Sequence, residues 1–207
     1  MIGSACGAGA YLRRLEVAEE TCEYLDGDVW LMPGMKWTHH QLMRWLTRRM
    51  LIELDPTRFD VLLSELGVCD PGRLYAFPDL AVSAHPPTLV RDGGKDFVAD
   101  PLLIVEVLSQ STAAYDRGPK FEAYSRLKSL QTVAFVWSDQ RRVETFERRR
   151  VDEDWSRSVA TGPDEVVRLP FAGTEVAFPV AELFAEVRSS DALDPKDDPG
   201  DESNGCR

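Results

Sequence analysis

A glutamate in the middle of an otherwise apolar run is the feature that most restricts how this chain can fold. Residues 102–108 read LLIVEVL, between Asp100-Pro101 and Ser109. Such a run is typical of a β-strand buried on both faces of a sheet. Glu106 is then carried into the interior, where an ionised carboxylate costs on the order of several kcal/mol unless a cation or hydrogen bonds compensate it. The alternative is an edge strand whose glutamate faces water, or a purely structural ion pair.

Predicted helices and strands surround this run in the pattern of one α+β domain. Apolar residues at helical spacing predict a helix that opens in a capping box of Thr38 and Gln41 and stops at Asp55-Pro56. Further helices are expected at 120–127 and after Pro179. Strands are expected at 29–32, 59–63, 75–84, 102–108, 133–137, 143–147, 155–160, 166–169 and 175–178. The expected architecture is a mixed β-sheet core flanked by helices, with an additional C-terminal β segment.

Charge is distributed unevenly along the 207 residues. Lys and Arg number 24 against 35 Asp and Glu, for a net charge of −11. This balance argues against a general polyanion binder but allows a small basic site on an acidic body. Residues 189–207, rich in Asp, Pro, Gly and Ser, are expected to form a disordered acidic tail. Residues 1–10 are expected to be a flexible arm, which leaves 11–188 as a single domain.

The four cysteines are far apart and form no CxxC pair, so free thiols in a reducing compartment are expected. The N-terminus lacks the pattern of a signal peptide, and no apolar stretch approaches eighteen residues. These features predict a cytoplasmic protein with no membrane partner.

Asp79 is the first candidate to share a site with Glu106. It follows Pro78 at the head of a strand-like stretch on which Asp79, Ala81 and Ser83 share one face. Two carboxylates on adjacent strands can hold a hard divalent cation, Mg²⁺ or Mn²⁺, through oxygen ligands. Taken alone, an aspartate in this position is more often a solvated acid beside a turn.

Lys120 is the third candidate. Pro119 suits the first turn of a helix, which puts Lys120 where the helix dipole disfavours a cation and indicates an anionic partner. An ordinary surface lysine is the alternative. Two carboxylates and a lysine are the set that metal-dependent phosphodiester hydrolysis needs. The metal polarises a phosphoryl oxygen and activates a water, while the lysine orients that water or offsets the developing charge.

These residues stand in motifs that resemble a known family. Over roughly residues 24–187 the chain is similar to the Uma-type restriction endonucleases, a branch of the PD-(D/E)XK nuclease superfamily. The resemblance rests on YLDGD at 24–28, the His40-Gln41 helix start, FPD at 77–79, DP at 100–101, VEVLS at 105–109, and most specifically STAAYDRGPKF at 111–121 followed by Tyr124. Gln110, where proline is common, and Thr132-Val133, where Glu-Tyr is usual, depart from the pattern.

The resemblance implies a restriction-endonuclease-like fold and a divalent metal. Asp79 and Glu106 are then the metal ligands, and Lys120 joins them as the third catalytic residue. Strand alternation puts Leu108 where the superfamily's simpler motif has its lysine, and the family is similar in having moved that lysine onto the following helix. Nucleic acid, in the first place DNA, is the implied partner, and a homodimer is implied for cutting two strands.

Three more residues are candidates to line the site. His40 matches the family motif, Glu65 is expected on a strand leading into the same region, and Tyr124 follows the lysine motif, although packing of its helix on the sheet is the simpler role. No dinucleotide-binding loop or other cofactor motif is found. Arginine pairs or triplets at 48–49, 141–142 and 148–150 are candidates to contact a nucleic-acid backbone, although such clusters are usually solvated.

The expected function is that of a magnesium-dependent endonuclease. The alternative is a non-catalytic binding or interaction protein on the same fold, which the acidic balance favours. A third reading keeps the metal-dependent hydrolase but exchanges DNA for RNA or a small phosphodiester.

Overall fold

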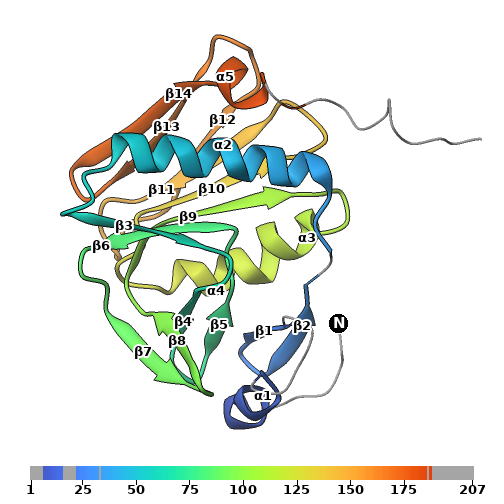
Figure 1. The fold of residues 1–207 in the computed structure, drawn as a ribbon, viewed down its shortest axis with the longest axis vertical. Coiled ribbons are helices and arrows are strands. Elements are labelled where there is room, and N and C mark those ends of the chain that lie inside the picture. Colours follow the sequence, from blue (N-terminus) through green and yellow to red (C-terminus); the bar gives the residue numbers. More distant parts are fainter. Residues whose placement is uncertain (1–6, 16–21, 33, 186, 188–207) are drawn as a thin grey trace, which may run out of the picture.

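The structure is a computed structural model that describes residues 7–15, 22–32, 34–185 and 187 (Figure 1). Residues 1–6 of the expected arm and the expected tail at 189–207 lie outside the described residues. Helix α1 (Ala8–Leu15) begins within the range expected for the arm, and it buries Tyr11, Leu12 and Leu15.

A six-stranded mixed sheet forms the centre of the fold. In spatial order its strands are β12 (Ser156–Ala160), β11 (Val143–Glu147), β10 (Thr132–Trp137), β9 (Pro101–Leu108), β6 (Leu80–Ala84) and β3 (Phe59–Leu63). Strands β9 and β10 are parallel, and α3 (Ala113–Tyr115), η1 (Asp116–Lys120) and α4 (Phe121–Ser125) connect them. All residues of β9 except Leu102 are buried, so the predicted interior strand is confirmed.

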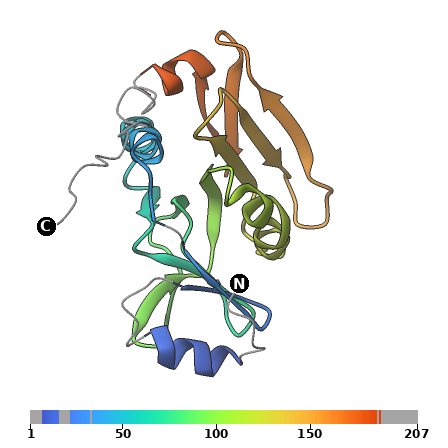
Figure 2. The same ribbon diagram turned by 90° about the vertical axis from the view of Figure 1, so that its right-hand side faces the viewer.

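Different elements cover the two faces of this sheet. One face packs against α2 (Trp37–Glu53), α5 (Val180–Phe184) and the hairpin of β13 (Val166–Phe171) and β14 (Thr174–Pro179), around Leu46, Val105 and Phe178. The other face packs against α4 through Ile104 and Tyr124. Figure 2 shows α2 and α4 on opposite sides of the sheet. The predicted α+β fold, with helices on both faces and a C-terminal β segment, is confirmed.

A second six-stranded sheet lies below the central one in Figure 1. It contains the expected strand at 29–32 and the start of the run at 75–84, and its other strands have no predicted counterpart. Its core combines apolar side chains with an aromatic cluster that contacts α1. Its spatial order is β2 (Asp28–Leu31), β1 (Cys22–Leu25), β5 (Leu74–Ala76), β4 (Gly67–Asp70), β8 (Lys95–Val98) and β7 (Leu89–Asp92).

The run at 75–84, expected to be one strand, is divided between the two sheets. Strand β5 belongs to the second sheet and β6 to the central one, and the chain crosses between them at Phe77-Pro78-Asp79. Pro78 cannot donate a ladder hydrogen bond, which favours a break in pairing at this point.

The expected capping box at the start of α2 is wrong. Trp37 is already helical, the N-cap is Lys36, and no side chain caps the helix there, so Thr38 lies inside the first turn. The end of α2 agrees with the expected stop at Asp55-Pro56, since the helix ends at Glu53. None of the helices in the described residues combines the length and apolar character needed to cross a bilayer.

The close approach of β4 and β8 at Gly67 gives a test of the second sheet. A Cβ added at Gly67 would lie 2.7 Å from Phe97 Cδ1 and 2.9 Å from Ala76 O. We expect Gly67→Ala to lower the free energy of unfolding by about 1–3 kcal/mol, measured by urea unfolding. Gly34 has nothing within 4 Å of an added Cβ, so Gly34→Ala should change it by less than about 0.5 kcal/mol. Equal unfolding midpoints for the two variants would contradict this packing.

Candidate active site

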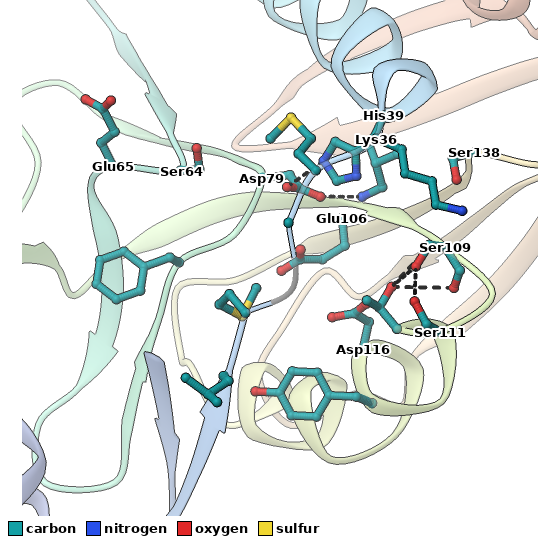
Figure 3. Close-up of a pocket in the computed structure, with 18 of the residues that line it drawn as sticks. Lys36, His39, Ser64, Glu65, Asp79, Glu106, Ser109, Ser111, Asp116 and Ser138 are labelled. Carbon is teal, nitrogen blue, oxygen red and sulfur yellow. Dashed lines mark hydrogen bonds and ion pairs between the residues drawn. The ribbon is translucent and has the colours of Figure 1, made fainter. Parts of the chain in front are cut away.

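The adjoining ends of two antiparallel strands bring Asp79 and Glu106 together. Asp79 immediately precedes β6, which pairs with β9, and its Oδ2 accepts a hydrogen bond of 2.7 Å from Val107 N. Asp79 and Glu106 both line a cavity of about 420 Å³ (Figure 3). The two carboxylates singled out in the sequence therefore face one cavity, in a fixed relation set by the strand pairing.

Lys120 lies behind Glu106, surrounded by three carboxylates. Its Nζ is 2.9 Å from Glu106 Oε1, 3.0 Å from Glu23 Oε1 and 3.6 Å from Asp116 Oδ1. The Lys120 side chain is 0% exposed, and it is absent from the lining of the cavity. Burial acts to lower the pKa of Lys120, but the three carboxylates outweigh it and raise this pKa well above its ordinary value. Lys120 is therefore a fixed ammonium, and its anionic partners belong to the chain itself.

The backbone before Lys120 explains how it turns inward. Gly118 has φ −103° and ψ −108°, outside the helical region. The following Pro119 disfavours the helical region, and a glycine can adopt this conformation because it has no Cβ. Lys120 consequently lies at the junction of η1 and α4, and not in the first turn of an isolated helix. The wide turn of η1 leaves Asp116 and Lys120 on one side, where they form their ion pair.

Glu106 has both of its polar contacts on one oxygen. Oε1 lies 2.9 Å from Lys120 Nζ and accepts a 2.7 Å hydrogen bond from the Tyr124 hydroxyl. Oε2 makes no hydrogen bond or ion pair with any residue that the structure describes. Burial raises the pKa of Glu106 well above its ordinary value, and Asp79, Asp116 and Glu23 add to this effect against the opposing ammonium of Lys120. One oxygen is thus committed to the interior, and the other is available to a ligand.

Glu23, which the sequence reasoning missed, connects the second sheet to this site. It lies in β1, is fully buried, and accepts hydrogen bonds from Phe77 N at 2.8 Å and from the Tyr115 hydroxyl at 2.7 Å. Phe77 is two residues before Asp79, so Glu23 also fixes the segment that presents Asp79. The available signal was the same as for Glu106: an acid in a short run that is otherwise apolar, CEYL at 22–25.

His39, and not His40, faces the cavity. His39 lines it, and its Nε2 lies 2.9 Å from Asp79 Oδ1. His40 is exposed, stacks on Trp37 with ring centroids 5.3 Å apart, and lines an adjoining groove along α2. Successive residues of an α-helix project about 100° apart, so only one of the two histidines can face the cavity. A match to the family motif cannot show which of the two histidines faces the cavity.

Glu65 and Tyr124 reach the site in different ways. Glu65 lies in the turn after β3, not on a strand, and its exposed side chain is part of the cavity wall. Tyr124 does not line the cavity; it is fully buried and contacts Glu106 from the interior. Tyr115 and Asp116, which were not singled out in the sequence, do line it.

The donors at the cavity fit a divalent cation held by few protein ligands. Glu23, Glu106 and Asp116 surround the ammonium of Lys120, and Asp79 and Glu65 also line the cavity. These five carboxylates outnumber Lys120 and the two lysines of the cavity wall, Lys36 and Lys95, so negative charge is in excess. Within the described ranges, no three His, Cys, Asp or Glu residues are placed to hold a metal together. Magnesium is commonly bound by one or two carboxylates and keeps several waters, so Asp79 and Glu106 form a sufficient set.

A mixed sheet flanked by helices, with acids at the adjoining ends of β6 and β9 and a lysine on the crossover that follows, defines a protein with a restriction-endonuclease-like fold. A family model, Uma2, described as "Putative restriction endonuclease", matches residues 9–181. The chain therefore belongs to the Uma2 family.

Related proteins agree with this assignment. Two uncharacterised proteins of Synechocystis sp. are similar to the chain: one is 28% identical over 79% of this chain and 92% of its own length, the other 33% identical over 70% and 75%. A crystal structure described as "a putative nuclease belonging to DUF820", from Anabaena variabilis, superimposes with a TM-score of 0.65 at 17% identity. It covers 81% of this chain and 92% of that one, and it shows that the fold is shared.

Removing the buried ammonium should be costly for folding. We expect Lys120→Met to lower the free energy of unfolding by about 3–5 kcal/mol, because it leaves three carboxylates close together without a counter-charge. The measurement is urea unfolding at pH 7, with Lys128→Met at an exposed lysine as the control.

A second substitution tests whether uncompensated carboxylates cause the loss of stability in Lys120→Met. Adding Glu23→Gln to Lys120→Met removes one uncompensated charge, so the double variant should recover part of the lost stability, with a coupling of at least about 0.5 kcal/mol. If Lys120→Met were as stable as Lys128→Met, the ion-pair cluster would not hold the site together.

Proposed function

We propose that the protein is an endonuclease that hydrolyses phosphodiester bonds of nucleic acid, DNA in the first place, with Mg²⁺ or Mn²⁺. The observation that carries the proposal is that Asp79 and Glu106, from paired strand ends, line one cavity directly in front of the buried Lys120. Membership of the Uma2 family supports the nuclease class.

In this proposal Asp79 and Glu106 hold the cation. Such a cation, when bound, polarises a phosphoryl oxygen and lowers the pKa of a coordinated water. The chain prepares both ligands: Val107 N and His39 engage the two oxygens of Asp79, and Tyr124 and Lys120 engage Oε1 of Glu106. Ligands oriented in this way lose little freedom on binding, which favours a defined geometry.

Lys120 assists the attacking water through Glu106. As a permanent ammonium it cannot accept the water's proton, and it is buried behind the carboxylate. Its charge favours the ionised form of Glu106 and offsets negative charge that develops at the scissile phosphate.

A homodimer presenting two such sites to the two strands is part of the same proposal. Cys22 and Cys69 are buried thiols that form no disulfide, which supports a reducing compartment such as the cytoplasm.

The two carboxylates can be tested without removing the buried ammonium. We expect Asp79→Asn and Glu106→Gln each to lower the rate of DNA cleavage about 100-fold or more, because each removes a charge from the cation site. Cleavage of plasmid DNA and of RNA measures this effect, and circular dichroism verifies folding. Glu122→Gln, on the exposed side of α4, is the matched control and should retain the wild-type rate. Equal rates in all four proteins would contradict the proposal.

Metal dependence separates the nuclease from a binding module without turnover. EDTA should stop cleavage, and excess Mg²⁺ or Mn²⁺ should restore it. Isothermal titration calorimetry of the metal-free protein should show heat of Mn²⁺ binding that is lost in Glu106→Gln. A wild-type protein that binds neither metal would favour the non-catalytic alternative.

A further inference from the structure

Of the three arginine-rich segments noted in the sequence, the one at 141–142 contributes to an arginine cluster beside the site. Arg148 is buried and donates to the carbonyl oxygens of Leu127 and Leu130, so it is structural. Arg49 pairs with Glu53 and Glu182 on the opposite face of the central sheet. Arg142, in contrast, belongs to a cluster beside the cavity.

This arginine cluster lies on the same face of the sheet as Glu106. In the strand register Glu106 is opposite Phe135 of β10, and Phe135 is opposite Glu144 of β11. Directly opposed residues of neighbouring strands share a face, so Glu144 lies two strands from Glu106 on one surface. Trp137 and Arg117 are the sequence neighbours of Ser138 and Asp116, which line the cavity. The cluster therefore adjoins the cavity wall.

Glu144 is the anchor of this cluster. Its side chain is 0% exposed, and it lies 3.0 Å from Arg117 Nη2, 2.6 Å from Arg142 Nη2 and 3.3 Å from Arg157 Nη2. Burial acts to raise the pKa of Glu144, but the three guanidinium groups outweigh it and keep this pKa below its ordinary value. One ionised carboxylate thus faces three cations, and the cluster is locally positive on an acidic chain.

The arginines keep donors available to solvent. The side chains of Arg117, Arg142 and Arg157 are 38%, 32% and 45% exposed. The guanidinium carbons of Arg117 and Arg142 also lie 5.8 and 5.6 Å from the centre of the Trp137 ring, which holds their planes in place. Each guanidinium has five N–H donors in a rigid fork that matches a phosphate group, and Glu144 uses only some of them.

We propose that Arg117, Arg142 and Arg157, held by Glu144, bind the sugar–phosphate backbone of the nucleic-acid strand whose scissile bond enters the cavity. This inference rests on the proposed nuclease function. One arginine is enough to neutralise one buried carboxylate, whereas three leave surplus charge and oriented donors directed outward. The net charge of −11 disfavours general binding of a polyanion, so a locally positive cluster is the kind of surface that such a chain needs for it.

The test compares two double variants with the same change in charge. Arg142→Gln/Arg157→Gln removes two members of the cluster and keeps Arg117. Arg91→Gln/Arg168→Gln removes two exposed arginines, each paired with one acid, elsewhere on the chain. Fluorescence anisotropy with labelled duplex DNA, single-stranded DNA and RNA is measured in EDTA over a salt series. The cluster variant should bind about tenfold more weakly than wild type, with a log–log salt slope smaller by up to about two, while the control should match wild type.

Folding is measured in parallel by urea unfolding. If Arg142→Gln/Arg157→Gln is unfolded, the triple variant with Glu144→Gln, which removes the buried charge together with two of its partners, replaces it in the same comparison. The nucleic acid whose affinity depends on the cluster identifies the strand type that this surface accepts.

The outcomes separate this surface from the nuclease proposal. Equal affinities of the cluster variant and the control, or a wild type that binds none of the nucleic acids at low salt, would overturn the surface. A cluster-dependent affinity in a wild type that never cleaves would support the surface and overturn the nuclease. Cleavage by the wild type, with unchanged binding in the cluster variant, would support the nuclease and overturn the surface.

Discussion

The ammonium of Lys120 and the carboxylates around it are the interaction on which the rest of the structure depends. The partners come from separate elements: Glu23 from the second sheet, Glu106 from the central sheet, and Asp116 from the crossover that carries Lys120 itself. Charges removed from water in this way are tolerated only when all of them are in place. The two sheets and the crossover therefore have to assemble around one another, and the candidate site forms at the point where they meet.

The same arrangement prepares the site for a ligand. Main-chain and side-chain donors already engage both oxygens of Asp79, while Glu106 is held through one oxygen only. Negative charge exceeds positive charge in this region, and burial increases the mutual repulsion of the carboxylates. A cation at the cavity would relieve that repulsion, so its binding and the stability of the folded chain are coupled.

The sequence was informative where one residue was out of keeping with its neighbours. An acid inside LLIVEVL identified the interior strand and Glu106. The run at 75–84 was expected to be one strand, and the proline before Asp79 is where it crosses between the two sheets. Other features depend on geometry that no local pattern contains. Which of His39 and His40 faces the cavity depends on the rotation of α2, and the role of Glu23 depends on a sheet built from six short strands of mixed composition. The inward turn of Lys120 arises at Gly118, a non-helical glycine directly before Pro119.

The strand register that relates Glu106 to Glu144 also sets the distance between the cavity and the arginine cluster. Neighbouring strands lie about 4.8 Å apart, so the acid at the cavity and the anchor of the arginine cluster are separated by about 10 Å across the sheet. Successive phosphates of a nucleic-acid strand advance by about 3.4 Å along the helix axis. A backbone that reaches from one point to the other spans about three nucleotides. Under the proposed nuclease function, the smallest good substrate is an oligonucleotide of at least that length, because a single phosphodiester linkage would not reach the arginine cluster.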